Sequence, residues 1–241
     1  MIKRVFVLLK IGRKLAQSEI LDIFSKFHKI PILIKVLFYF LSFSFKKKND
    51  VNYNIDDKER LSSSLQSMGT TFIKLGQFLA TRPDIIGESL SKQLEKLQDK
   101  LPAFPLSDAK AIIKSDLGDQ MFNSILNISE PIAAASIAQV HKAQINDNGT
   151  IKDVAIKILR PEIKKIFNDE IDALMFFAFI LESIVKKTKR LKLVEVTFLL
   201  KQITNHEMDL RFEAAAANEY AENTKNDVGF KVPKIYWNLT S

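Results

Sequence analysis

The chain has 241 residues, of which 46% are hydrophobic and 27% charged. This composition excludes wholesale disorder, and the length suits one large domain or two small ones. The absence of cysteine excludes disulfide scaffolds, thiolate metal sites and cysteine nucleophiles, and three scattered histidines do not indicate a zinc site.

The net charge of +8 lies in the first 50 residues, which hold 11 Lys and Arg against 3 Asp and Glu, so the rest of the chain is neutral. A solvated basic helix pair is one interpretation of this arm. Because the charges alternate with large apolar side chains, we expect residues 1–48 to contact an anionic membrane surface. No nucleic-acid-binding motif accompanies the charges, so no nucleic acid partner is predicted.

The most apolar part of the arm is Ile30–Phe45, a run of 16 residues that includes Pro31 and Lys35. It is shorter than the ~20 apolar residues that a spanning helix needs. It also lies too far from Met1 for an ordinary signal peptide. We therefore predict a helix that is interfacial or buried in the protein and that ends at Lys46–Lys48.

A polar linker precedes an apolar stripe of helical period, which predicts a helix over 59–81 that ends before Pro83. Lys74 and Gln77 fall on its opposite, polar face. The stripe consists of Leu61, Leu65, Met68, Phe72, Leu75 and Leu79.

Further helices are expected near 87–99 and 108–116, the second capped by Ser107. From about residue 127 the pattern becomes β-like. Two apolar runs, 137–145 and 152–159, flank Asn146-Asp147-Asn148-Gly149 and predict a hairpin. Two long helices and a short strand should follow, at about 161–185, 193–225 and 231–237.

The first chemical clue is Lys157 in Val154-Ala155-Ile156-Lys157. A lysine on an edge strand that points to water is the ordinary interpretation. The same four residues, however, are typical of the phosphate-contacting lysine on the third strand of protein kinases.

A kinase lysine needs a phosphate-covering loop upstream, of the pattern G-x-G-x-x-G-x-V. Here alanine stands at all three glycine positions, so backbone N–H groups could still approach phosphates. Alanine does not readily adopt positive φ, and the loop geometry should therefore differ from that of a typical kinase. The segment is Ala133, Ala134, Ala135, Ser136, Ile137, Ala138, Gln139 and Val140.

A carboxylate partner for Lys157 is expected from the helix near 193–225. Asp209 and Glu213, four residues apart, would share a face and repel each other, and Lys157 would relieve that repulsion. The alternative is a solvated face on which Glu207 pairs with Arg211.

Together with Lys74-Leu75-Gly76-Gln77, these segments resemble the UbiB family of atypical protein-kinase-like proteins, which are tied to ubiquinone (coenzyme Q) biosynthesis. The family's K-x-G-Q motif matches Lys74, Gly76 and Gln77, and its E-x-D motif matches Glu207 and Asp209. The resemblance runs from about residue 55 to the last residue.

The resemblance implies ATP or ADP, with Mg, as cofactors. Lys157 would contact the α/β-phosphates and pair with Glu213 as the catalytic pair, and the alanine-rich loop would cover the phosphates. The helices with Lys74 and Gln77 would pack across the mouth of the nucleotide cleft and face the E-x-D motif.

No catalytic-loop Asp and Asn and no D-F-G-type Asp occur in the sequence, and no metal ligands are predicted. The chain thus resembles the N-terminal half of the family, and we expect it to be inactive alone. A separate C-lobe chain or other ubiquinone-biosynthesis proteins would be its partners. The alternatives are a non-enzymatic membrane-surface helical module and the relic of a split gene.

The predicted fold class is α+β, a mostly helical N-terminal extension followed by an incomplete protein-kinase-like N-lobe with a small antiparallel sheet. The expected domains are a basic apolar arm (1–50), a helical K-x-G-Q extension (55–126) and the N-lobe (127–241). The expected location is the cytoplasmic side of a bacterial inner membrane, or its mitochondrial equivalent, without a spanning helix.

Overall fold

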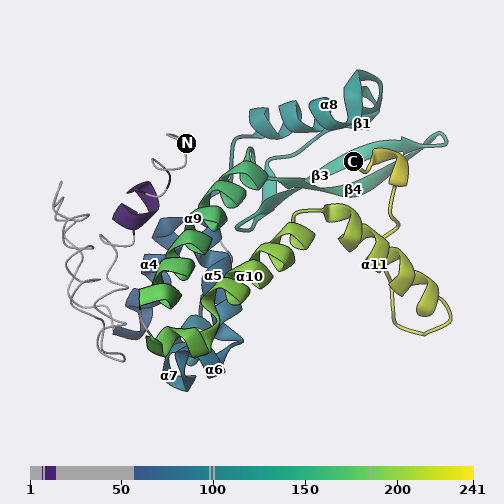
Figure 1. Ribbon diagram of the computed structural model, residues 1–241. Helices are drawn as coiled ribbons and strands as arrows, with labels where there is room; N and C mark the ends of the chain where they lie inside the picture. Colours follow the sequence, from purple (N-terminus) through teal and green to yellow (C-terminus); the bar gives the residue numbers. More distant parts are fainter. Residues whose placement is uncertain (1–6, 8, 15–56, 98, 100, 185) are drawn as a thin grey trace. The chain divides into compact units, whose positions relative to one another are not determined.

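The computed structural model describes residues 7, 9–14, 57–97, 99, 101–184 and 186–241 (Figure 1). The described residues form helices and a small antiparallel sheet, which confirms the α+β class. The helices are α4 (Asp57–Met68), α5 (Thr70–Ala80), α6 (Pro83–Ile86), α7 (Glu88–Leu94), α8 (Leu106–Asn123), α9 (Ile163–Ile184), α10 (Leu193–Glu207) and α11 (Leu210–Asn223), with 3₁₀ turns η1 (Lys186–Leu191) and η2 (Trp237–Leu239). The strands are β1 (Ile125–Leu126), β2 (Pro131–Ala134), β3 (Ala138–Asp147) and β4 (Thr150–Leu159).

The chain forms two compact units. The helical unit comprises 1–99 and 165–201, and the sheet unit comprises 100–164 and 202–241. The division falls inside α9 and α10, so both units are assembled from two separate segments. The domain limits expected from the sequence stay a prediction.

The helical unit contains α4 and α5 where one helix over 59–81 was expected. That expectation is wrong because Gly69 adopts φ +104°, a conformation that interrupts the helix. The stripe residues in α4 and Phe72 are buried as expected. Beyond the break the buried side turns, so that Ile73 is fully buried whereas Leu75 and Leu79 are only half-buried.

Gly76 lets α5 approach its neighbours closely. A Cβ atom at this position would lie 2.6 Å from Leu97 Cδ2 and 2.8 Å from Leu65 Cδ1. Both leucines belong to the buried core of this unit. The glycine of the K-x-G-Q motif therefore has a packing role of its own.

Of the basic arm, only residues 7 and 9–14 are described. Ile11 is buried, and Lys14 Nζ donates to Met68 O at 2.9 Å and to Glu170 Oε1 at 3.2 Å. The Glu170 side chain lies in α9 and is 11% exposed. This piece of the arm is thus packed onto the helical unit, while Ile30–Phe45 lies outside the described residues. No helix in the described ranges has the length and apolar character needed to cross a membrane.

The sheet unit is organised around β3. β4 pairs antiparallel along one side of it, and β1 and β2 pair with the two ends of its other side. The predicted hairpin is confirmed. It turns at Asn148 and Gly149, which adopt φ 55° and 86°, as expected for a two-residue Asn-Gly turn.

Other expectations fail at element ends. Ser107 does not cap α8, since Pro105 holds that position. The expected helix over 193–225 breaks at Met208-Asp209, and residues 231–236 are not a strand. The helix expected near 87–99 ends at Leu94.

Candidate functional site

The β3–β4 hairpin has two chemically different faces, set by the alternation of side chains along each strand. One face packs on α8 and carries a buried apolar cluster. The opposite face carries polar residues of both strands, among them Lys142, Gln144 and Asp153. Val140 pairs directly with Lys157 on this polar face. The buried cluster consists of Phe104, Ala109, Ile113, Ile125, Ala143, Ile145 and Ile158.

Lys157 meets a carboxylate on the polar face, as the sequence predicted. Its Nζ donates to Glu213 Oε2 of α11 at 2.5 Å. The lysine side chain is 40% exposed and that of Glu213 61% exposed. An ion pair this open adds little to stability. A cation that faces solvent on a rigid strand is, however, well placed to bind an anion.

Asp209 positions the helix that carries Glu213. It is the N-cap of α11 and accepts from the Arg211 backbone N–H at 3.2 Å. It also accepts from Arg211 Nε at 2.8 Å and Nη2 at 2.7 Å. The bidentate bond with this guanidinium lowers the pKa of Asp209 to about 2. Glu213 then lies in the first turn, where a negative charge suits the helix dipole.

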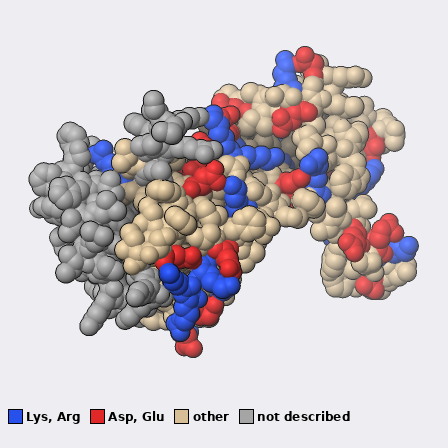
Figure 2. All heavy atoms as spheres, in the orientation of Figure 1, with Lys and Arg blue, Asp and Glu red and all other residues tan. Residues whose placement is uncertain are grey.

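This geometry corrects one interpretation of the sequence. Asp209 lies outside α11, so it does not share a helical face with Glu213, and its partner is Arg211 rather than Lys157. The break between α10 and α11 causes this difference. Glu207, for which a pair with Arg211 was the alternative, ends α10 and is exposed. Figure 2 shows acidic side chains gathered over α11.

The alanine-rich loop connects β2 and β3. A bond from Ala135 N to Ala138 O, 2.8 Å long, closes its turn. Ala133 is exposed, whereas the turn residues from Ser136 to Gln139 are buried. The structure thus brings Val140 beside Lys157 and places the loop at the same end of the hairpin. The roles proposed for these residues stay predictions.

A buried polar network lies beneath this loop, and sequence reasoning missed it. Gln139 Oε1 accepts from Phe104 N at 2.9 Å, and its Nε2 donates to Phe104 O at 3.1 Å. Nε2 also lies 2.9 Å from Nε2 of His141, whose Nδ1 lies 2.8 Å from Ser129 O. Because the amide nitrogen can only donate, the histidine Nε2 accepts and its proton is on Nδ1. The sequence did contain a signal for this network. The two polar residues stand two positions apart in a strand, so both face the core together with the apolar residues of that face.

The K-x-G-Q residues lie in α5 of the helical unit. Lys74 Nζ lies 3.7 Å from Asp99 Oδ2, and its side chain is only 11% exposed. Gln77 is half-buried. The E-x-D residues belong to the sheet unit, so the expected meeting of the two motifs stays a prediction.

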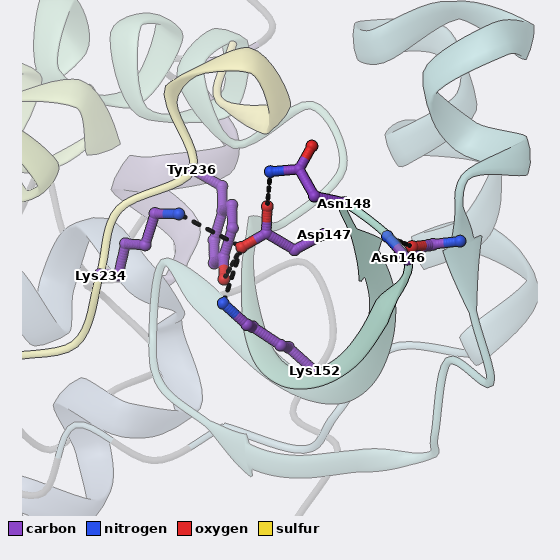
Figure 3. Close-up of polar contacts among 7 residues, drawn as sticks. Asn146, Asp147, Asn148, Lys152, Lys234 and Tyr236 are labelled. Carbon is purple, nitrogen blue, oxygen red and sulfur yellow. Dashed lines mark hydrogen bonds and ion pairs between the residues drawn. The ribbon is translucent and has the colours of Figure 1, made fainter.

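A second polar cluster stands at the opposite end of the hairpin (Figure 3). Asp147 Oδ2 accepts from Lys152 at 2.8 Å and from Lys234 at 3.3 Å, and these two cations lower the pKa of Asp147. Tyr236 OH lies 3.4 Å from the same oxygen. These bonds fasten the segment 231–239 to the hairpin and border an open hollow of about 360 Å³. Val140, the β3 partner of Lys157, lies seven residues from Asp147 along the strand. This hollow is therefore separate from the lysine site.

Metal-binding side chains do not converge in the described ranges. No group of three or more His, Asp or Glu there could hold a metal ion. The polar face of the hairpin offers the Lys157 ammonium group to an anion.

Comparison with known proteins adds a family and close relatives. A family model described as the ABC1 atypical kinase-like domain matches residues 96–241. A Marinobacter nauticus protein named "Probable protein kinase UbiB" is 32% identical over 91% of this chain and 39% of its own length. Proteins of the same name from Azotobacter vinelandii (36% identical, 74% of this chain, 33% of the relative) and Pseudomonas aeruginosa (30%, 95%, 42%) also match.

The chain thus spans between 33% and 42% of the length of these relatives. No solved structure matches the chain.

Proposed function

Because the chain belongs to the ABC1 atypical kinase-like family, we propose that its sheet unit binds ATP or ADP through Lys157 and the alanine-rich loop. The observation that carries this is the ion pair between Lys157 and Glu213 on the solvent-facing side of the hairpin. The pair holds the ammonium group at a defined place, beside a loop of small residues. A phosphate can then take the ammonium's remaining donor directions.

The chemistry assigned to these residues is binding and orientation. Lys157 neutralises phosphate charge, Glu213 orients Lys157, and Asp209 fixes the helix that presents Glu213. Mg²⁺ would supply further charge neutralisation when bound with the nucleotide. Its ligands would include the nucleotide's own phosphates.

The biological setting is proposed from the relatives. Proteins named UbiB cover most of this chain, and the family resemblance ties such proteins to ubiquinone biosynthesis. We propose that the chain serves that pathway as an ATP-binding kinase-like factor. Complete phosphoryl transfer would need catalytic and metal-binding residues from a further lobe.

Nucleotide binding to the purified chain tests this proposal. Titration calorimetry with ATP and ADP, with and without Mg²⁺, should give saturable binding. Lys157→Ala should weaken it about tenfold or more, since a charge-assisted bond is lost. Lys142→Ala is the matched control, because Lys142 lies on the same polar face of the hairpin as Lys157 and pairs with Asp153. Absence of binding by a folded chain, or equal losses in both variants, would contradict the proposal.

A membrane role is a second proposal and rests on the charge of the N-terminal arm. Its Lys and Arg excess favours an anionic lipid surface, on the cytoplasmic side of a bacterial inner membrane or its mitochondrial equivalent. Sedimentation with vesicles containing anionic lipid should retain the chain at low salt. Replacing Lys46–Lys48 by Ser should reduce that binding, whereas Lys157→Ala should leave it unchanged. Equal binding to neutral vesicles would contradict the proposal.

A further inference from the structure

Arg160, the first residue after β4, holds both sides of the turn in the alanine-rich loop. Its backbone N–H donates to Ile137 O at 2.9 Å. Its guanidinium donates to Ala135 O twice, from Nε at 3.0 Å and from Nη2 at 2.7 Å. One residue therefore binds two carbonyl groups of a three-residue turn.

The same guanidinium joins the loop to the segment that precedes α8. Nη1 donates to Pro102 O at 2.9 Å and Nη2 to Leu101 O at 3.3 Å. The group also lies over the ring of Phe104, 5.9 Å from its centroid. A planar fork with several donors can serve all three carbonyls together, which an ammonium group cannot do.

That neighbouring segment is itself held rigidly. Both backbone groups of Phe104 bond to the side chain of Gln139, which is buried and in turn bonds to His141. Gln139 and His141 are among the most deeply buried side chains of the sheet unit, at 1% and 0% exposed. Arg160 thus ties the loop to a fixed support rather than to a mobile one.

We propose that Arg160 is a positioning residue for the phosphates of a bound nucleotide, acting through the alanine-rich loop. This rests on the proposed nucleotide site. Carbonyl oxygens in a loop repel phosphate. The guanidinium offsets the partial negative charge of the Ala135 carbonyl oxygen and so reduces this repulsion. The clamp also selects one conformation of the turn before the nucleotide arrives, which lowers the entropic cost of binding. Alanine, unlike glycine, does not readily adopt positive φ, so an alanine-rich loop needs another source of stability. The hydrogen bonds of Arg160 supply it.

Hydrogen exchange and nucleotide titration on the full chain together test this role. The reporter is the amide of Ala135, which is bonded to Ala138 O. In Arg160→Gln without nucleotide, its exchange should accelerate about tenfold or more while amides in the middle of β3 and β4 keep their protection. ATP affinity should fall about tenfold, and Arg160→Lys should give a smaller loss of both kinds. Lys142→Gln, an exposed cation of the same hairpin, should leave both quantities unchanged.

Each outcome decides the proposal. Unchanged Ala135 exchange in both Arg160 variants would overturn it, even if ATP affinity fell. Faster exchange with unchanged ATP affinity would overturn the link to the nucleotide. Loss of β3–β4 protection in both variants would show that Arg160 only supports the fold, and would also overturn it. If the wild-type chain bound no ATP, the proposed function would fail, and the exchange rates would still establish or refute the clamp.

Discussion

The two faces of the β3–β4 hairpin use the same two strands in opposite ways. On the buried face, Ala143, Ile145 and Ile158 pack together, and the polar Gln139 and His141 are fully hydrogen-bonded. The polar face instead carries open pairs, Lys142 with Asp153 and Lys157 with Glu213, whose side chains are 40% exposed or more.

Stability and chemistry are therefore located on opposite faces of this hairpin. Burial of apolar groups and satisfaction of buried polar groups stabilise a fold, whereas exposed ion pairs contribute little. We therefore expect changes on the buried face to lower stability and changes on the polar face to affect ligand binding. Substitution of one residue should therefore change stability, whereas substitution of its neighbour on the same strand should change ligand binding.

The largest effect is expected from neighbours on β4. Ile158→Ala should lower the free energy of unfolding by about 3 kcal/mol, since it removes buried methyl and methylene groups and leaves a cavity. Lys157→Ala should lower it by less than about 1 kcal/mol, because its ion pair is open to solvent. Urea denaturation followed by circular dichroism measures both. Equal losses would refute the contrast between the faces.

A smaller effect is expected from two glutamines of β3. Gln139→Leu should cost about 2 kcal/mol, because it leaves both backbone groups of Phe104 and a nitrogen of His141 unpaired in the interior. Gln144→Leu is the matched control, since Gln144 bonds to Asn127 and Asp153 near the surface. It should change stability by less than about 0.5 kcal/mol. A Gln144→Leu variant as unstable as Gln139→Leu would contradict the comparison.

The cap of α11 extends the contrast to a helix end. Asp209→Ala should loosen the first turn, where Glu213 lies, and weaken ATP binding about threefold. Asp209→Asn keeps an oxygen that can accept from the Arg211 backbone N–H, so its affinity should stay near that of the wild type. Calorimetric titration of the two variants separates them. A larger loss in the asparagine variant would show that charge, and not capping, matters.

The smallest effect is a pH dependence that arises at two partly buried carboxylates, Asp209 and Asp147. The pKa of Asp209 is lowered from 3.8 to about 2 in the folded chain, chiefly by its hydrogen bonds to Arg211. A carboxyl whose pKa is lower in the folded state stabilises the fold above its unfolded pKa, and this contribution is lost as pH falls through the folded value. Stability should therefore decline between about pH 4 and pH 2.

Asp147 contributes in the same direction, because Lys152 and Lys234 lower its pKa. Urea midpoints measured from pH 6 to pH 2 should fall less steeply in Asp209→Asn and Asp147→Asn than in the wild type. Parallel curves for all three proteins would exclude these carboxylates as a source of the decline.

Local chemistry allowed much of the sheet unit to be predicted from the sequence. Asn148-Gly149 between two apolar runs specified the hairpin. The pair of Lys157 with Glu213 was implied by the family resemblance, and the structure contains it. The helix breaks were missed for different reasons. Gly69 interrupts an unbroken apolar stripe through its φ angle, and Asp209 is a capping residue inside a pattern that continues as if helical.

The supports of the alanine-rich loop could not be predicted, because their contacts join distant positions. Arg160 reaches carbonyls of residues 101, 102 and 135, and Gln139 bonds to Phe104. No spacing in the sequence encodes such contacts. The loop itself was recognised from its composition, whereas the residues that fix its shape required the fold.

The position of β3 between all the other strands also determines where the chain tolerates a change in length. A residue inserted near the start of β3 would move every later side chain of that strand to the opposite face, and so expose His141 and bury Lys142. It would disturb the register with β4 and with β1 at once. An insertion between Asn148 and Gly149 would lengthen only an exposed turn. Natural length variation and engineered tags should therefore be accommodated at the tip of the hairpin and not within its central strand.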